Sequence, residues 1–126
     1  MGLRTPLSRA RGLGSAKDGT HHWWIQRITA IALVPLSLWF VASMVGLAGA
    51  DHAAVTAWLA HPAVAVLMVL LVAATLHHAQ LGLQTMYEDY IHLHWLKIVA
   101  DLTTKMASLA LGVAAAFAVL KIALGG

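Results

Sequence analysis

The sequence contains no cysteine, and only 10% of its 126 residues are charged. The missing thiols exclude disulfides, thiolate metal sites and cysteine nucleophiles. A soluble domain carries about a quarter charged residues. With 60% hydrophobic residues and a mean hydropathy of +0.78, this chain cannot cover its apolar surface with polar groups in water. We therefore expect an integral membrane protein.

The chain also lacks a glycine-rich dinucleotide fingerprint and, without cysteine, the usual ligands of an iron–sulfur cluster. We therefore expect it to be non-catalytic alone. Its formal net charge is +3, but the basic residues do not form the stripe that is typical of a nucleic-acid-binding surface. No nucleic-acid partner is expected.

Three long apolar segments predict three transmembrane helices, because a hydrocarbon core needs about 20 apolar residues in a helix. No charged residue lies between Arg27 and Asp51, and none between Asp51 and Glu88. We place the helices at about 25–50, 62–88 and 98–124. The predicted fold is an all-α membrane protein that is part of a heteromeric helical bundle. A basic cytoplasmic arm, 1–24, precedes a transmembrane domain, 25–126.

The distribution of Lys and Arg predicts the orientation, since cytoplasmic segments carry more of them. The amino-terminal part through Arg27 holds five, and the second connection with its flank holds Lys97 and Lys105. Only Lys121 lies on the other side. We predict a multi-pass membrane protein, surrounded by lipid, with a cytoplasmic amino terminus and a carboxyl terminus on the opposite side of the membrane.

One face of the second helix collects small and polar residues in an otherwise aliphatic segment. At helical spacing this face holds Leu71, Thr75, His78, Gly82, Thr85 and Asp89. An intramembrane histidine is a functional candidate, and neutral imidazole is a standard axial ligand of haem iron. Gly82 leaves space for a flat macrocycle one turn away. The same pair also fits a histidine that hydrogen-bonds a neighbouring helix beside a packing glycine. These residues alone leave both interpretations open.

The neighbouring His77 projects about 100° away from His78, so the two cannot bind one iron from opposite sides. No other histidine lies deep in a predicted helix. A six-coordinate haem would therefore need its second ligand from another subunit. We interpret His77 as a packed or interface histidine.

Asp89 and Tyr90 fall at the cytoplasmic membrane boundary. A phenol there can donate a hydrogen bond to a quinone carbonyl, and a carboxylate can orient it or relay protons. The alternative is an interfacial tyrosine beside a solvated acid. Arg27, on the same side, can pair with a haem propionate or with Asp89, or simply set the topology.

These residues together resemble the smaller membrane-anchor subunit of succinate:quinone oxidoreductase (respiratory complex II), of the alphaproteobacterial and mitochondrial type. That family has Arg-x-Thr-Ala at the start of the first helix, then His-x-x-x-Gly and Asp-Tyr on the second. The matching segments are Arg27-Ile-Thr29-Ala30, His78-Ala-Gln-Leu-Gly82 and Asp89-Tyr90-Ile-His92.

The resemblance implies that His78 is one axial ligand of a haem b shared with a second anchor subunit. Arg27 and Gly82 would lie beside that haem. Tyr90 would contact ubiquinone, with Asp89 in support, at a site built jointly with the iron–sulfur subunit. A flavoprotein subunit would oxidise succinate. The spacings to Gly82 and Asp89 favour His78 as the ligand within the doubled histidine.

Two other functions remain as alternatives. The chain can be a haem-free structural or assembly subunit of another respiratory complex, with the polar stripe serving as a packing seam. It can also be a small ion or proton transporter. This last is the weakest, because three helices with one polar stripe supply little of a lined pathway unless they oligomerise.

Overall fold

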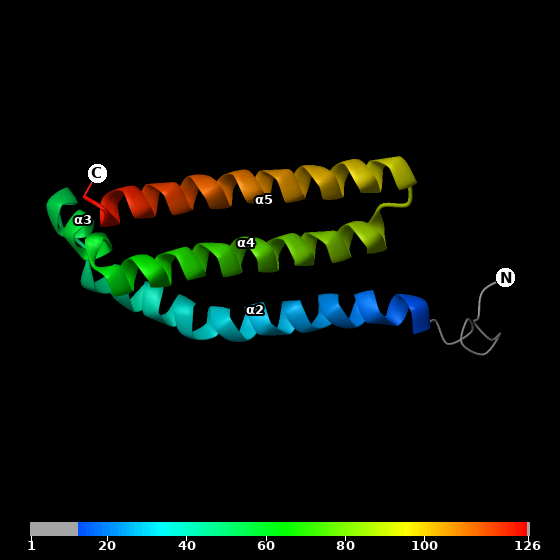
Figure 1. Cartoon of the computed structure of the whole chain (residues 1–126), viewed down its shortest axis with the longest axis horizontal. Coiled ribbons are helices and arrows are strands. Elements are labelled where there is room, and N and C mark those ends of the chain that lie inside the picture. The colour runs from blue at the N-terminus through cyan, green and yellow to red at the C-terminus, as the bar shows by residue number, and fades with distance from the viewer. Residues whose placement is uncertain (1–12, 126) are drawn as a thin grey trace.

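The computed structural model describes residues 13–125, and over that range the chain consists of helices joined by short connections. The helices are α2 (Leu13–Gly46), α3 (His52–Ala60), α4 (Pro62–Tyr90) and α5 (His94–Ala123) (Figure 1). Three segments are long and apolar enough to cross a membrane: Thr20–Gly46, Pro62–Tyr90 and His94–Ala123. The prediction of an all-α protein with three transmembrane helices is confirmed.

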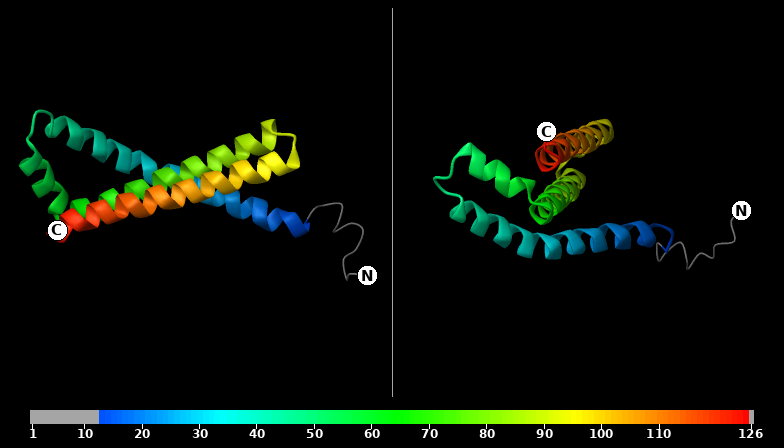
Figure 2. Two further views of the ribbon diagram at one scale, coloured as in Figure 1. Left: turned by 90° about the horizontal axis from the view of Figure 1, so that it is seen from above. Right: turned by 60° about the vertical axis from the view of Figure 1, so that its left-hand side comes forward.

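Helix α4 lies in the middle of the molecule. It packs against α2 on one side and α5 on the other, whereas no Cα atoms of α2 and α5 lie within 8 Å of each other in residues 13–125. Helices α4 and α5 run nearly side by side, while α2 crosses them obliquely and curves along its length (Figure 2). Consequently the start of α2, the end of α4 and the start of α5 lie at the same end of the molecule (Figure 1).

The three long helices do not enclose a core. Among the residues whose burial is described, only Ala65, Leu81 and Val119 are buried. Large apolar side chains such as Ile31 and Phe117 are about 70% exposed, at 71% and 67%. A continuous apolar surface of this kind needs lipid or other helices to cover it.

Helix α2 starts earlier than the helix predicted from the sequence at 25–50. It begins at Leu13, so the second half of the predicted arm, 1–24, is helical. The first twelve residues lie outside the described part of the chain. A helix grows readily once it is nucleated, and no proline interrupts the sequence between Pro6 and Pro35. Pro35 itself lies inside α2, and the helix continues through it.

The first connection, between the predicted helices at 25–50 and 62–88, contains the short helix α3. Gly49 adopts a φ of +82°, a conformation that glycine reaches without strain, and turns the chain after α2. The Asp51 carboxylate accepts a hydrogen bond of 2.9 Å from the Ala54 N–H and caps α3. Trp58 of α3 stacks on Trp39 of α2, with ring centroids 5.8 Å apart. These contacts fix the connection against the first transmembrane helix.

The second connection is shorter than the interval between the predicted helices at 62–88 and 98–124. Only residues 91–93 are non-helical. Glu88, Asp89 and Tyr90 form the last turn of α4, and α5 begins at His94. No glycine or proline occurs between Gly82 and Gly112, so nothing in the sequence ends the helix early.

Candidate functional site

His78 is held against α2 by a single hydrogen bond. Its Nδ1 lies 3.0 Å from the Oγ1 of Thr29, and both side chains are half-buried between α2 and α4. A histidine bonded to a neighbouring helix is what the packing interpretation predicted. The contact uses one ring nitrogen only, and no hydrogen bond of Nε2 lies within residues 13–125. One nitrogen is therefore left for another partner.

Gly82 lies one turn from His78 and faces the same helix, α2. A Cβ atom added at Gly82 would have the Gln26 Nε2 as its nearest neighbour outside the helix, at 4.0 Å. The Gln26 Oε1 is buried, and it has no hydrogen-bond partner in the described part of the chain. A buried acceptor without a partner costs about 1–3 kcal/mol. Space and an unsatisfied polar atom thus occur together beside His78.

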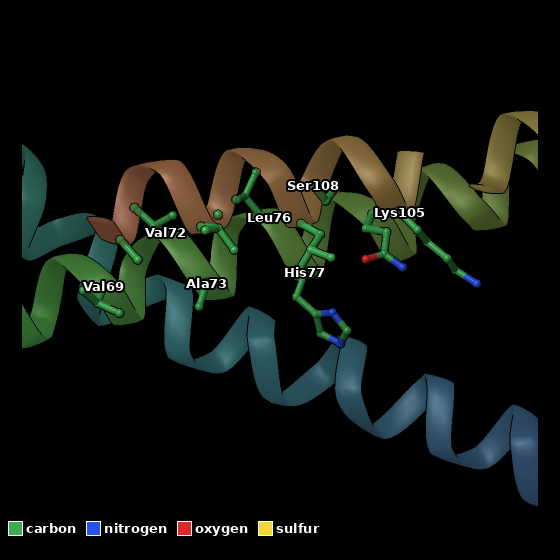
Figure 3. A pocket seen from close by; sticks show the side chains of 12 residues that line it. Val69, Val72, Ala73, Leu76, His77, Lys105 and Ser108 are labelled. Carbon is green, nitrogen blue, oxygen red and sulfur yellow. The ribbon is translucent and has the colours of Figure 1, made fainter. Parts of the chain in front are cut away.

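His77 occupies a different environment from His78, as the 100° offset predicted. It is exposed and borders two grooves, one of about 340 Å³ between α4 and α5 and one of about 370 Å³ between α2 and α4. Figure 3 shows its ring directed from α4 toward α2. This chain leaves the side chain of His77 exposed, so a second subunit could cover it, and its role as an interface histidine stays a prediction.

Arg27 is an exposed residue of α2 and directly follows Gln26, the neighbour of Gly82. Its guanidinium carbon lies 5.0 Å from the ring centroid of Trp23, a cation–π contact. The ion pair with Asp89 that was one of the alternatives is not formed in residues 13–125. The salt bridge found there joins Lys105 to Asp101, at 3.0 Å within α5.

Asp89 and Tyr90 lie on the last turn of α4, and both are exposed. Tyr90 keeps 77% of its surface accessible, and its hydroxyl has no hydrogen bond to any described residue. The structure brings His78 and Gly82 together with the α2 segment that contains Arg27. No hydrogen bond or ion pair joins Asp89 or Tyr90 to that group in the part of the chain that the structure describes.

Three side chains that the sequence analysis left without a role take part in the contacts between helices. Thr29 binds His78, although it was noted only as part of a motif. Tyr87 Oη lies 2.8 Å from Thr104 Oγ1 and joins α4 to α5. The threonine in Arg-x-Thr-Ala was an available signal for the first contact. The Tyr87–Thr104 contact depends on the register of α4 against α5, which no sequence pattern reveals.

Comparison with known proteins decides the family. The family model described as "Succinate dehydrogenase/Fumarate reductase transmembrane subunit" matches residues 1–120. The chain belongs to this family. The resemblance found in the sequence motifs is thereby confirmed.

Curated relatives within this group carry the name "Succinate dehydrogenase hydrophobic membrane anchor subunit". The protein of Rickettsia bellii is 36% identical over 107 residues, which cover 85% of this chain and 86% of the relative. That of Rickettsia conorii is 34% identical over 75% of this chain and 76% of its own length. That of Paracoccus denitrificans is 33% identical over 68% and 67%. No solved structure matches.

Proposed function

We propose that this anchor subunit co-ligates a haem b through His78 and helps to form a ubiquinone-reduction site through Tyr90 and Asp89. The observation that carries the proposal is the state of His78. Its ring is held between two helices through Nδ1, while Nε2 makes no hydrogen bond to a described residue. An intramembrane imidazole in this state is suited to bind a metal.

The residues around His78 fit a haem. A porphyrin supplies four of the iron ligands, so His78 of this chain and one residue of a second anchor subunit would hold the iron. When bound, the haem accepts and donates single electrons. Gly82 offers open backbone one turn away, and Gln26 offers an unsatisfied polar atom beside it. Arg27 can exchange its contact with Trp23 for a charged bond to a propionate.

Tyr90 and Asp89 fit a quinone site at the cytoplasmic end of α4. The free Tyr90 hydroxyl can donate a hydrogen bond to a quinone carbonyl, and the exposed Asp89 carboxylate can pass protons from water. Asp89 lies about 16 Å along the helix from His78, from 11 residues at 1.5 Å each. The haem and quinone positions on this helix are therefore close but distinct.

The exposed apolar faces of α2, α4 and α5 support a heteromeric assembly. In this proposal they pack against the second anchor subunit and against inner-membrane lipid. The iron–sulfur subunit covers the cytoplasmic end, and the flavoprotein subunit supplies electrons from succinate. The amino terminus is cytoplasmic and the carboxyl terminus periplasmic, as the positive charges predict.

The test is His78→Ala in the complex purified through a tag on this chain, with His77→Ala as the matched control. We expect His78→Ala to remove or shift the haem b band in the reduced-minus-oxidised spectrum, and His77→Ala to preserve it. A normal spectrum in His78→Ala would remove His78 as the ligand. The reverse pattern would assign the iron to His77.

A haem-free structural subunit is the second candidate function. The Thr29–His78 hydrogen bond favours it, because a polar bond between helices is itself a packing device. Purification in mild detergent separates the two candidates. A preparation without haem and without a co-purifying flavoprotein would support the structural role.

A further inference from the structure

Thr29 has more hydrogen-bonding contacts than its single proton can serve. Its Oγ1 lies 2.8 Å from the Ile25 carbonyl oxygen, 3.0 Å from that of Gln26 and 3.0 Å from the Nδ1 of His78. A hydroxyl donates one hydrogen and accepts with its lone pairs. The two carbonyl oxygens can only accept. If either of them receives the proton, the contact with His78 requires Nδ1 to be the donor.

The direction of this bond determines the tautomer of His78. A neutral imidazole that carries its proton on Nδ1 has a bare lone pair on Nε2, and the opposite tautomer has an N–H there. Only a nitrogen with a free lone pair can bind iron. With the Thr29 proton donated to a carbonyl oxygen of its own helix, His78 is left in the form that a metal requires.

We infer that Thr29 is a positioning residue that holds the His78 ring in place and fixes its proton on Nδ1, so that Nε2 faces the haem iron as a ligand. The inference rests on the proposed haem function and deepens it. A ligand histidine whose second nitrogen donates a hydrogen bond is better oriented and more basic. A more basic ligand stabilises ferric over ferrous iron, and this lowers the midpoint potential of the haem.

The experiment compares Thr29→Val with Thr29→Ser in the purified four-subunit complex. Valine keeps the shape of threonine and removes the hydroxyl, whereas serine keeps the hydroxyl. We expect Thr29→Val to shift the haem midpoint potential to a more positive value, alter the electron paramagnetic resonance spectrum of the oxidised haem and weaken haem retention about tenfold or more. Thr29→Ser should restore all three properties.

Thr104 provides a matched control on the other side of α4. Its hydroxyl lies 2.8 Å from the Ala100 carbonyl oxygen and 2.8 Å from the Tyr87 hydroxyl, so it repeats the bonding of Thr29 away from His78. Thr104→Val removes an equivalent bond between helices. We expect it to leave the haem potential and resonance spectrum unchanged. Equal shifts in Thr29→Val and Thr104→Val would show a general packing effect and overturn the inference.

Two further results would also overturn it. One is an unchanged potential and resonance spectrum in Thr29→Val at normal haem content, and the other is a failure of serine to restore them. The variant His78→Ala distinguishes an error about the role of Thr29 from an error in the proposed haem function. If His78→Ala loses the haem while Thr29→Val resembles the wild type, His78 is still the ligand and only the role of Thr29 is wrong. If His78→Ala keeps a normal haem, the proposed ligand itself is wrong.

Discussion

The two sides of α4 differ at their glycines. Toward α5, a Cβ added at Gly112 would lie 3.3 Å from Leu76 Cδ1, so the helices are close at this point, at the edge of the groove of about 340 Å³ between them. Toward α2, a Cβ added at Gly82 would meet its nearest neighbour only at 4.0 Å. A glycine in close contact lets two helices approach, whereas a glycine beside free space leaves room for a ligand.

Hydrogen bonding shows a related difference. Toward α5, the Tyr87 and Thr104 hydroxyls bond each other and join the two helices. Toward α2, the Thr29–His78 bond uses Nδ1 of the ring and leaves Nε2 without a hydrogen bond to any described residue. The neighbouring Gln26 Oε1 is buried and also has no partner there. The α4–α5 contact satisfies these two hydroxyls within the chain, whereas the α2–α4 contact has the unsatisfied polar atoms that the proposed haem site would use.

The largest effect is expected from a bulky residue at Gly82. Gly82→Leu should fill the space beside His78 and abolish haem binding, whereas Gly82→Ala should retain it because its Cβ finds ordinary contact distances. Haem content per complex, with the amount of this subunit measured by immunoblot, checks the prediction. Full haem content in Gly82→Leu would mean that the free space lies elsewhere.

A smaller effect, on stability, is expected at Gly112. Gly112→Leu, the match to Gly82→Leu, places a large side chain where a Cβ alone would lie 3.3 Å from Leu76 Cδ1, and overpacking of this kind costs about 1–3 kcal/mol. The thermal midpoint of the complex should fall while the haem spectrum stays normal. Leu76→Ala in the same chain should relieve part of the loss, because neighbouring substitutions couple. An altered haem spectrum in Gly112→Leu would contradict the separation between the two sides of α4.

Length and hydropathy were enough to predict the three membrane helices, because lipid requires long apolar helices. The helix ends were harder to predict. The expected loop after Glu88 is largely helix, since polar residues at a membrane boundary do not by themselves end a helix. The start of α2 at Leu13 was missed for the same reason.

The candidate site was predictable only in part. Spacing on one helix placed His78 and Gly82 on a common face, and the structure places that face against α2. The partner Thr29 lies 49 positions away, and its contact depends on how α2 crosses α4. Helical periodicity carries no information on that crossing. The roles of Arg27, Asp89 and Tyr90 stay predictions, because they depend on molecules outside this chain.

The smallest effect is expected from removing single tyrosine hydroxyls, and it distinguishes the end of α4 from its α5 side. Tyr90→Phe removes a free donor, and Tyr87→Phe removes the bond to Thr104. One hydrogen bond is worth about 0.5–1.5 kcal/mol, so Tyr90→Phe should lower the kcat/KM for ubiquinone by roughly two- to tenfold. Electron transfer to an artificial dye should be preserved.

Tyr87→Phe should instead lower the thermal stability of the complex by a similar free energy and leave electron transfer to both quinone and dye intact. Equal loss with quinone and dye in Tyr90→Phe would indicate an assembly defect, and the quinone role of Tyr90 would then be wrong.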